Sequence, residues 1–103
     1  MINTGVFMLK TRYKFLKKLY PWDVILFYKD GKYLLYDNDY YVLRVISYYN
    51  IVNELENNHI NYLIINNLRV IKHNIYCDNK YYEYLFKGLL IECFTCGFIS
   101  SKS

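Results

Sequence analysis

The sequence predicts a small α/β domain in which helices flank a mixed β-sheet, with the elements in the order αββαββαβ. The chain has 103 residues, of which 54% are hydrophobic and 20% aromatic, which is enough for one core in a single domain over residues 1–103. Two apolar runs, residues 24–29 and 32–36, flank Asp30-Gly31, the dipeptide that favours a type I′ hairpin turn. A helical pattern before this hairpin ends at Pro21, because proline disfavours the α conformation in the residue before it.

The first helix is expected over residues 10–19, with Thr11 as its candidate N-cap. Apolar side chains recur there at helical spacing while lysines gather on another face, which is typical of an amphipathic helix. We expect residues 1–9, and residues 96–103 at the other end of the chain, to be loose ends.

A second helix is expected over residues 40–49, with Asp39 as its N-cap. The apolar side chains of this segment form a face wide enough to lie on a sheet. Residues 54–58 are rich in polar side chains and are interpreted as a connection.

The remaining elements are a second hairpin, a short helix and a last strand. Residues 60–65 and 68–75 are predicted to pair around Asn66-Asn67, a weaker turn than Asp-Gly. A short helix over residues 78–87 is expected to begin at an Asp78 cap and to end with Gly88 at its C′ position. Residues 89–94 are then predicted to form a buried strand.

The positive charge of the chain is concentrated in its N-terminal third. The formal net charge is +4, but residues 1–36 hold seven Lys or Arg against two Asp, a balance of +5. Such an asymmetry attracts a phosphate backbone or an acidic protein surface, although a solvated helix face produces the same pattern. Lys, Tyr, Asn and Ile are abundant and Ala is absent, which is typical of an AT-rich genome and raises the Lys and Tyr content without any functional cause.

The first hairpin carries the strongest candidate binding residues. Tyr28, Tyr33 and Tyr36 alternate with Lys29 and Lys32, a composition that stacks bases and holds phosphates, although half of these side chains must point at the core. We therefore predict a nucleic-acid site in which Tyr33 stacks on a base and a set of lysines contacts phosphates: Lys14, Lys17, Lys18, Lys29 and Lys32.

Neither a metal centre nor a catalytic site is expected. Cys93 and Cys96 have the spacing of half a zinc site or of a redox pair, but Cys77, His59 and His73 form no second closely spaced pair of ligands. The histidines lie in no spacing that suggests a catalytic triad, and the chain has no Gly-rich phosphate loop. We expect no enzyme activity, no bound metal and no cofactor.

The expected location is a reducing compartment. The chain has three cysteines, an odd number, and its N-terminus lacks the pattern of a secretory signal. Its longest apolar stretch, residues 89–99, is interrupted by Glu92 and is shorter than the roughly 20 residues that span a bilayer. We expect a protein of the cytoplasm without a membrane partner, or of the host cytoplasm or nucleus for a viral protein.

Three stretches resemble, in the same order, the N-terminal mismatch-recognition domain of the MutS family of DNA mismatch-repair proteins. Residues 13–21 are similar to its opening helix, which ends in Tyr-Pro or His-Pro, and residues 24–39 to its strand, Gly-Asp-Phe-Tyr-Glu core and acidic helix start. Residues 78–94 are similar to its Tyr-Leu helix, its glycine and the strand with an Ile-Cys-Glu. The resemblance implies a domain I-like α/β fold and binding to DNA.

The resemblance also implies a loss of specificity. With Gly31 aligned to the family's glycine, Tyr33 lies at the phenylalanine that wedges beside a mismatched base, and Leu35 replaces the glutamate that hydrogen-bonds to that base. A shift of one residue places Lys32 and Leu34 there instead. Because leucine forms no side-chain hydrogen bond, we expect binding of DNA or RNA without specific mismatch readout, or an accessory role beside a larger nucleic-acid enzyme.

A protein-interaction module is the alternative, for example a small viral or mobile-element protein that scaffolds or inhibits a larger complex. Exposed tyrosines serve as interface anchors as readily as they stack on bases. The salt dependence of binding distinguishes the two hypotheses, because phosphate binding weakens steeply as the salt concentration rises, whereas the affinity of an apolar interface changes little.

Overall fold

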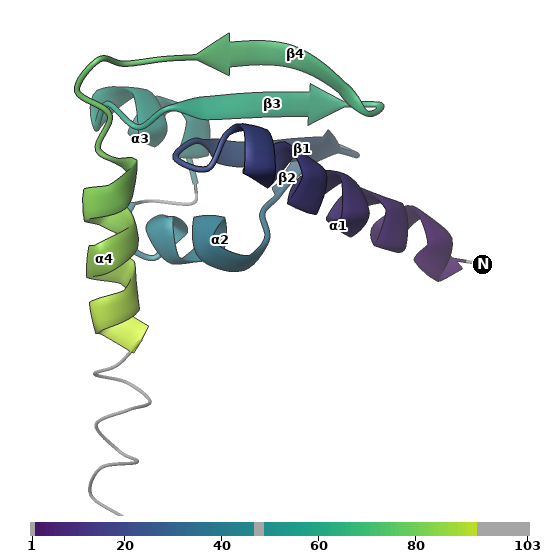
Figure 1. Cartoon of the computed structure of the whole chain (residues 1–103), viewed down its shortest axis with the longest axis horizontal. Coiled ribbons are helices and arrows are strands. Elements are labelled where there is room, and N and C mark those ends of the chain that lie inside the picture. The colour runs from purple at the N-terminus through teal and green to yellow at the C-terminus, as the bar shows by residue number, and fades with distance from the viewer. Residues whose placement is uncertain (1, 47–48, 93–103) are drawn as a thin grey trace, which may run out of the picture.

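The structure is a computed structural model that describes the backbone of residues 2–46 and 49–92 and the side chains of residues 9–46 and 49–91. Four strands form one mixed sheet in the order β2-β1-β3-β4, flanked by four helices in these residues (Figure 1). The strands are β1 (Val24–Lys29), β2 (Lys32–Leu34), β3 (Tyr62–Asn66) and β4 (Arg69–Asn74). The helices are α1 (Ile2–Leu19), α2 (Asp37–Leu43), α3 (Ile51–Asn57) and α4 (Tyr81–Glu92). The predicted α/β class with a mixed sheet is confirmed.

The central strands β1 and β3 run parallel, and each pairs antiparallel with its hairpin partner at the edge. Both faces of the two central strands are covered, which is why they read as continuous apolar runs in the sequence. One face packs against α1, and its core is formed by Tyr13, Leu16, Ile25, Phe27, Leu63 and Ile65. The other face packs against α2, α3 and α4 around Val24, Leu26, Tyr62 and Ile64.

The first hairpin has the predicted turn, whereas the second turn lies one residue later than expected. Asp30 and Gly31 have φ angles of 52° and 77°, as a type I′ turn requires. In the second hairpin Asn66 pairs with Arg69, so the turn residues are Asn67 and Leu68. An irregularity between Ile64 and Ile65 shifts the register of this pair of strands.

The helix boundaries at the N-terminal side differ from the prediction. Helix α1 already begins at Ile2, so residues 2–9 are helical rather than loose and Thr11 is not a cap. Helix α2 begins at Asp37 and ends at Leu43, well before residue 49. Residues 51–57 form the additional helix α3 instead of a polar connection, because Ile51 and Leu55 lie four residues apart and insert into the core.

The C-terminal prediction of a helix followed by a strand is wrong for the described residues. Helix α4 runs through residues 89–92, which gives the order αββααββα, while residues 93 and 94 and the predicted loose end at 96–103 lie outside the described residues. Gly88 lies inside α4, where a Cβ atom would come within 1.9 Å of the Tyr41 carbonyl oxygen of α2. The glycine therefore allows two helices to approach closely and does not end a helix. None of the described helices is long and apolar enough to cross a membrane.

Candidate functional site

The tip of the β1–β2 hairpin brings two lysines and two tyrosines together in cross-strand pairs. Lys29 is paired with Lys32, and Tyr28 with Tyr33, whose ring centroids lie 5.3 Å apart. Because directly paired residues of antiparallel strands share a face, the two ammonium groups repel each other across the hairpin, which costs a few tenths of a kcal/mol or more. An anion bound at this tip relieves that repulsion.

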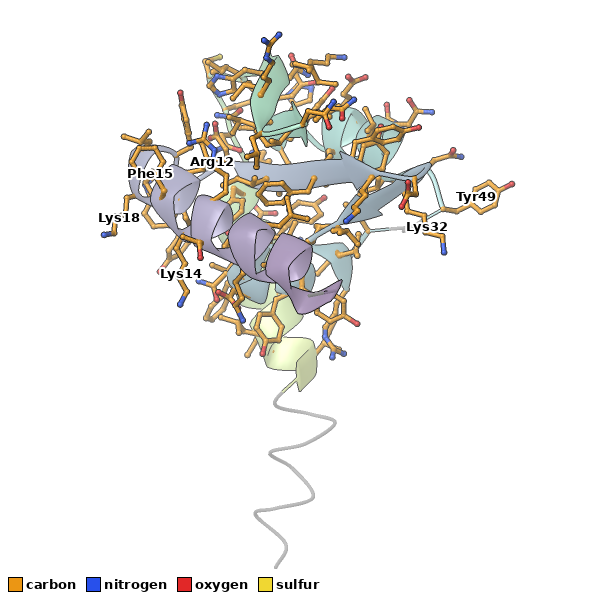
Figure 2. All side chains as sticks on the ribbon, turned by 90° about the vertical axis from the view of Figure 1, so that its right-hand side faces the viewer. Arg12, Lys14, Phe15, Lys18, Lys32 and Tyr49 are labelled. Carbon is orange, nitrogen blue, oxygen red and sulfur yellow. The ribbon has the colours of Figure 1, made fainter. Side chains whose placement is uncertain are left out.

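An open cavity of about 530 Å³ lies beside this tip. Gly31, Lys32 and Tyr33 line it from the hairpin, and the start of α3 with the preceding loop supplies Tyr49, Asn50, Ile51, Val52 and Asn53. Tyr49 is 90% exposed, and Figure 2 shows it at the same end of the molecule as Lys32. The cavity therefore combines a cation, two phenol rings and two amides, groups that can contact a phosphate, a base face and a base edge.

A second cavity of about 420 Å³ lies on the other side of the same turn. It is at the carboxyl ends of the parallel strands β1 and β3, the edge at which open α/β sheets bind ligands. Its lining is Leu9, Phe27, Tyr28, Lys29, Asp30, Ile65, Asn66, Asn67 and Leu68. The Asp30-Gly31 turn thus separates the two cavities. Among the described residues that line either cavity Asp30 is the only carboxylate, and it lines the second one.

The lysines of α1 do not extend this surface. Lys14 and Lys18 are exposed, but in Figure 2 they lie on the opposite side of the molecule from Lys32 and Tyr49. Arg12 lies nearer to the second hairpin, where its guanidinium is 5.4 Å from the Phe15 ring and donates to the Leu68 carbonyl oxygen at 3.4 Å. The predicted phosphate contacts are therefore divided between two separate surfaces.

Lys17, predicted as a phosphate contact, is instead part of an internal ion pair. Its Nζ donates to Asp39 Oδ1 at 2.7 Å and to the Asp23 carbonyl oxygen at 2.6 Å, and lies 4.4 Å from the centre of the Tyr81 ring. Only 18% of its side chain is exposed. The prediction was wrong because Lys17 follows the core residue Leu16 on the edge of α1 that faces the sheet, and its long side chain reaches inward along that edge.

Asp39 is the centre of this network. It is fully buried, and besides Lys17 it accepts hydrogen bonds from Tyr81 Oη at 2.6 Å and from the Ile25 backbone N–H at 3.0 Å. It therefore ties α1, α2, α4 and β1 together and is not the N-cap that the sequence suggested. The residue before α2, Tyr36, provides no side-chain cap.

Burial shifts the pKa values of the groups in this network. Burial lowers the pKa of Lys17 and raises that of Asp39, while the attraction between the two charges opposes both shifts. Burial, and then the negative charge of Asp39, raises the pKa values of Tyr13 and Tyr81 far above the usual range of tyrosine. Burial also raises the pKa of Tyr36 and of Tyr62.

We expect the free energy of unfolding to fall as the pH rises above about 10, the ordinary pKa of tyrosine. The four tyrosines release their protons at a higher pH in the folded state than in the unfolded chain, so the folded state binds more protons in this range. The lowered pKa of Lys17 makes the free energy of unfolding rise with pH below about 10.4, and this rise opposes only part of the fall caused by the tyrosines. Urea unfolding followed by circular dichroism between pH 8 and 11 measures the slope. Tyr81→Phe is expected to make it shallower, and an unchanged slope would contradict this assignment.

The two histidines form pairs with carboxylates at separate places. His73 Nε2 lies 2.7 Å from Asp23 Oδ2, and His59 Nδ1 lies 2.9 Å from Asp78 Oδ2. Among the described side chains, no three His, Cys, Asp or Glu residues gather in a group that could hold a metal ion. Cys93 and Cys96 lie outside the described residues, and Cys77 is exposed with a free thiol.

Both leucines that the resemblance aligns with the base-reading glutamate are partly buried. Leu35 packs against the core between the sheet and α2, α3 and α4, and Leu34 packs against the core beneath α1. In either alignment this position therefore serves packing. The chain matches no family model, no curated protein and no solved structure. The relationship to the mismatch-recognition domain stays a prediction.

Proposed function

We propose that this protein is a non-catalytic domain that binds single-stranded DNA or RNA through the tip of the β1–β2 hairpin, without reading a mismatch. The observation that carries the proposal is the pairing of Lys29 with Lys32 and of Tyr28 with Tyr33 between two cavities. The two pairs lie on opposite faces of the hairpin, so a strand that passes around the tip meets lysines on one face and tyrosine rings on the other, the two kinds of group that bind single strands with little sequence preference.

Each group at the tip has a role that its chemistry supplies. The two lysines hold a phosphate between them, and this contact replaces their mutual repulsion with attraction. The exposed ring of Tyr49 offers a face for a base, which is worth about 1–3 kcal/mol per stacked base, and the Tyr33 ring beside it is partly buried against the core. The amides of Asn50 and Asn53 can donate to and accept from a base edge in the same cavity.

The test is fluorescence anisotropy with a short, labelled single-stranded oligonucleotide over a salt series. We expect Lys29→Ala and Lys32→Ala each to weaken binding several-fold and to reduce the salt slope by about 0.7. Tyr49→Leu should weaken binding about tenfold because it removes a stacking face. Lys80→Ala removes the same charge from an exposed residue that lines neither cavity and serves as the matched control.

Oligonucleotides of different length and pairing show which surface of the protein binds them. A short strand should be insensitive to Lys14→Ala and Lys18→Ala, because those residues lie on the opposite side from Lys32, whereas a longer strand that wraps around the molecule gains contacts with them. A mismatched duplex should bind no better than a perfect one. The absence of binding at low salt, or equal effects of Lys32→Ala and Lys80→Ala, would contradict the proposal and favour the protein-interaction module.

A further inference from the structure

A row of exposed apolar side chains runs along α4 beside the face that packs against the core. Its members, called the α4 row here, are 38–64% exposed: Trp22, Tyr82, Phe86, Leu89 and Leu90. Trp22 joins the row from the loop before β1, with its ring centroid 5.5 Å from that of Tyr82. Residues spaced by three and four positions lie on one face of a helix, so the row is continuous.

The adjacent face of the same helix is already buried in the protein. Tyr81 and Leu85 belong to the core, and Gly88 lies against the backbone of α2. Helix α4 is therefore apolar on two sides, a pattern typical of a helix that is covered on both. The segment at residues 89–91, which the sequence predicted to be buried, is 38–43% exposed in this chain alone.

The charges beside the row point to the occupant. Glu83 and Lys87 form an ion pair along α4, with Lys87 Nζ 3.2 Å from Glu83 Oε2. In an antiparallel pair of identical helices the order of residues is reversed, so a two-fold axis level with position 85, one residue from Phe86, places each Glu83 beside the Lys87 of the other copy. The row itself carries no charge. The edge formed by Glu83 and Lys87 beside it is complementary in charge to the same edge of a second copy.

We propose that two copies of this chain form a symmetric dimer by packing their α4 rows together in antiparallel orientation. Phe86 lies near the two-fold axis, and two Glu83–Lys87 contacts between the copies flank it. Helix α4 is at the opposite end of the sheet from the β1–β2 turn (Figure 1), so both hairpin tips stay accessible in the dimer. The dimer does not depend on the proposed nucleic-acid binding.

Sedimentation equilibrium of the full chain across the micromolar range tests the dimer. We expect a species of twice the 12.6 kDa chain mass. Phe86→Lys should weaken dimerisation at least tenfold, because it places a charge at the centre of the apolar contact. Phe15→Lys is the matched control, since Phe15 is an equally exposed aromatic on α1, and it should leave the dimer intact. Circular dichroism shows whether each variant is folded.

A mixing experiment tests the antiparallel arrangement. Glu83→Lys and Lys87→Glu each break the ion pair within α4 and bring like charges together across the two-fold axis, so each variant alone should be a weaker dimer than wild type. An equimolar mixture should form a heterodimer, because one copy then presents only positive and the other only negative charges. The broken pair within each helix cannot explain such a recovery. A monomeric wild type, a dimer unaffected by Phe86→Lys, or no recovery on mixing overturns the proposal.

Discussion

The Asp39→Ala variant is expected to lose about 3–5 kcal/mol of its free energy of unfolding, the usual cost of removing one partner from a buried ion pair. The substitution leaves the Lys17 ammonium, with 18% of its side chain exposed, without its carboxylate. It also leaves the Ile25 N–H and the Tyr81 hydroxyl without their acceptor. Because domains of this size are stable by about 5–15 kcal/mol, this is a large share of the total.

Urea unfolding followed by circular dichroism measures this loss. Asp37→Asn is the control, because Asp37 is a half-exposed aspartate 4.0 Å from Lys10, and asparagine tolerates its left-handed φ of 49° as aspartate does. Its effect should stay below about 1 kcal/mol. Adding Lys17→Met to Asp39→Ala should recover part of the loss, since no uncompensated charge then remains in the core. Equal stabilities of the Asp39 and Asp37 variants would contradict this role of the network.

A part of this network could be read from the sequence. Asp39 lies three and four residues before Val42 and Leu43, which places it on the apolar stripe of α2. A carboxylate in that position must find a partner in the core. Its partners Lys17 and Tyr81 come from 22 and 42 residues away, and pairing over such distances depends on the tertiary fold.

The same distinction between local and distant information holds for the candidate site. The first hairpin was predicted correctly because the Asp30-Gly31 turn and the alternation around it are local features. The pairing of Lys29 with Lys32 follows from that turn alone. Tyr49, Asn50 and Asn53 were missed because they reach the site through the packing of α3 on the sheet. The α1 lysines were grouped with the hairpin by net charge, which carries no information on direction.

The last helix shows why an apolar run alone does not determine its own secondary structure. Residues 89–92 read equally well as a buried strand or as the end of a helix, because a short apolar run has no clear period. Gly88 before them was interpreted as a helix end, which is its commonest role at such a position. In the structure its missing side chain is used for packing, and the helix continues.

Gly88→Ala is therefore expected to destabilise the protein by about 2 kcal/mol or more, although alanine is the better helix former by about 1 kcal/mol. The new Cβ atom would lie 1.9 Å from the Tyr41 carbonyl oxygen, and because this contact is with backbone, α2 and α4 must move apart. Lys87→Ala, at an exposed position of the same helix, is the control and should cost about 0.5 kcal/mol or less.

Gly88→Asn separates this packing role from a role as a helix end. At a C′ position asparagine is the best tolerated replacement for glycine, because it adopts the left-handed conformation readily, so it would cost less than alanine there. Inside α4 the larger asparagine side chain must meet the same Tyr41 carbonyl, so it should cost more than alanine. Urea unfolding of the two variants gives the order of the costs. An asparagine variant more stable than the alanine variant would show that the helix ends at Gly88 and would remove the basis of the α4 row beyond that residue.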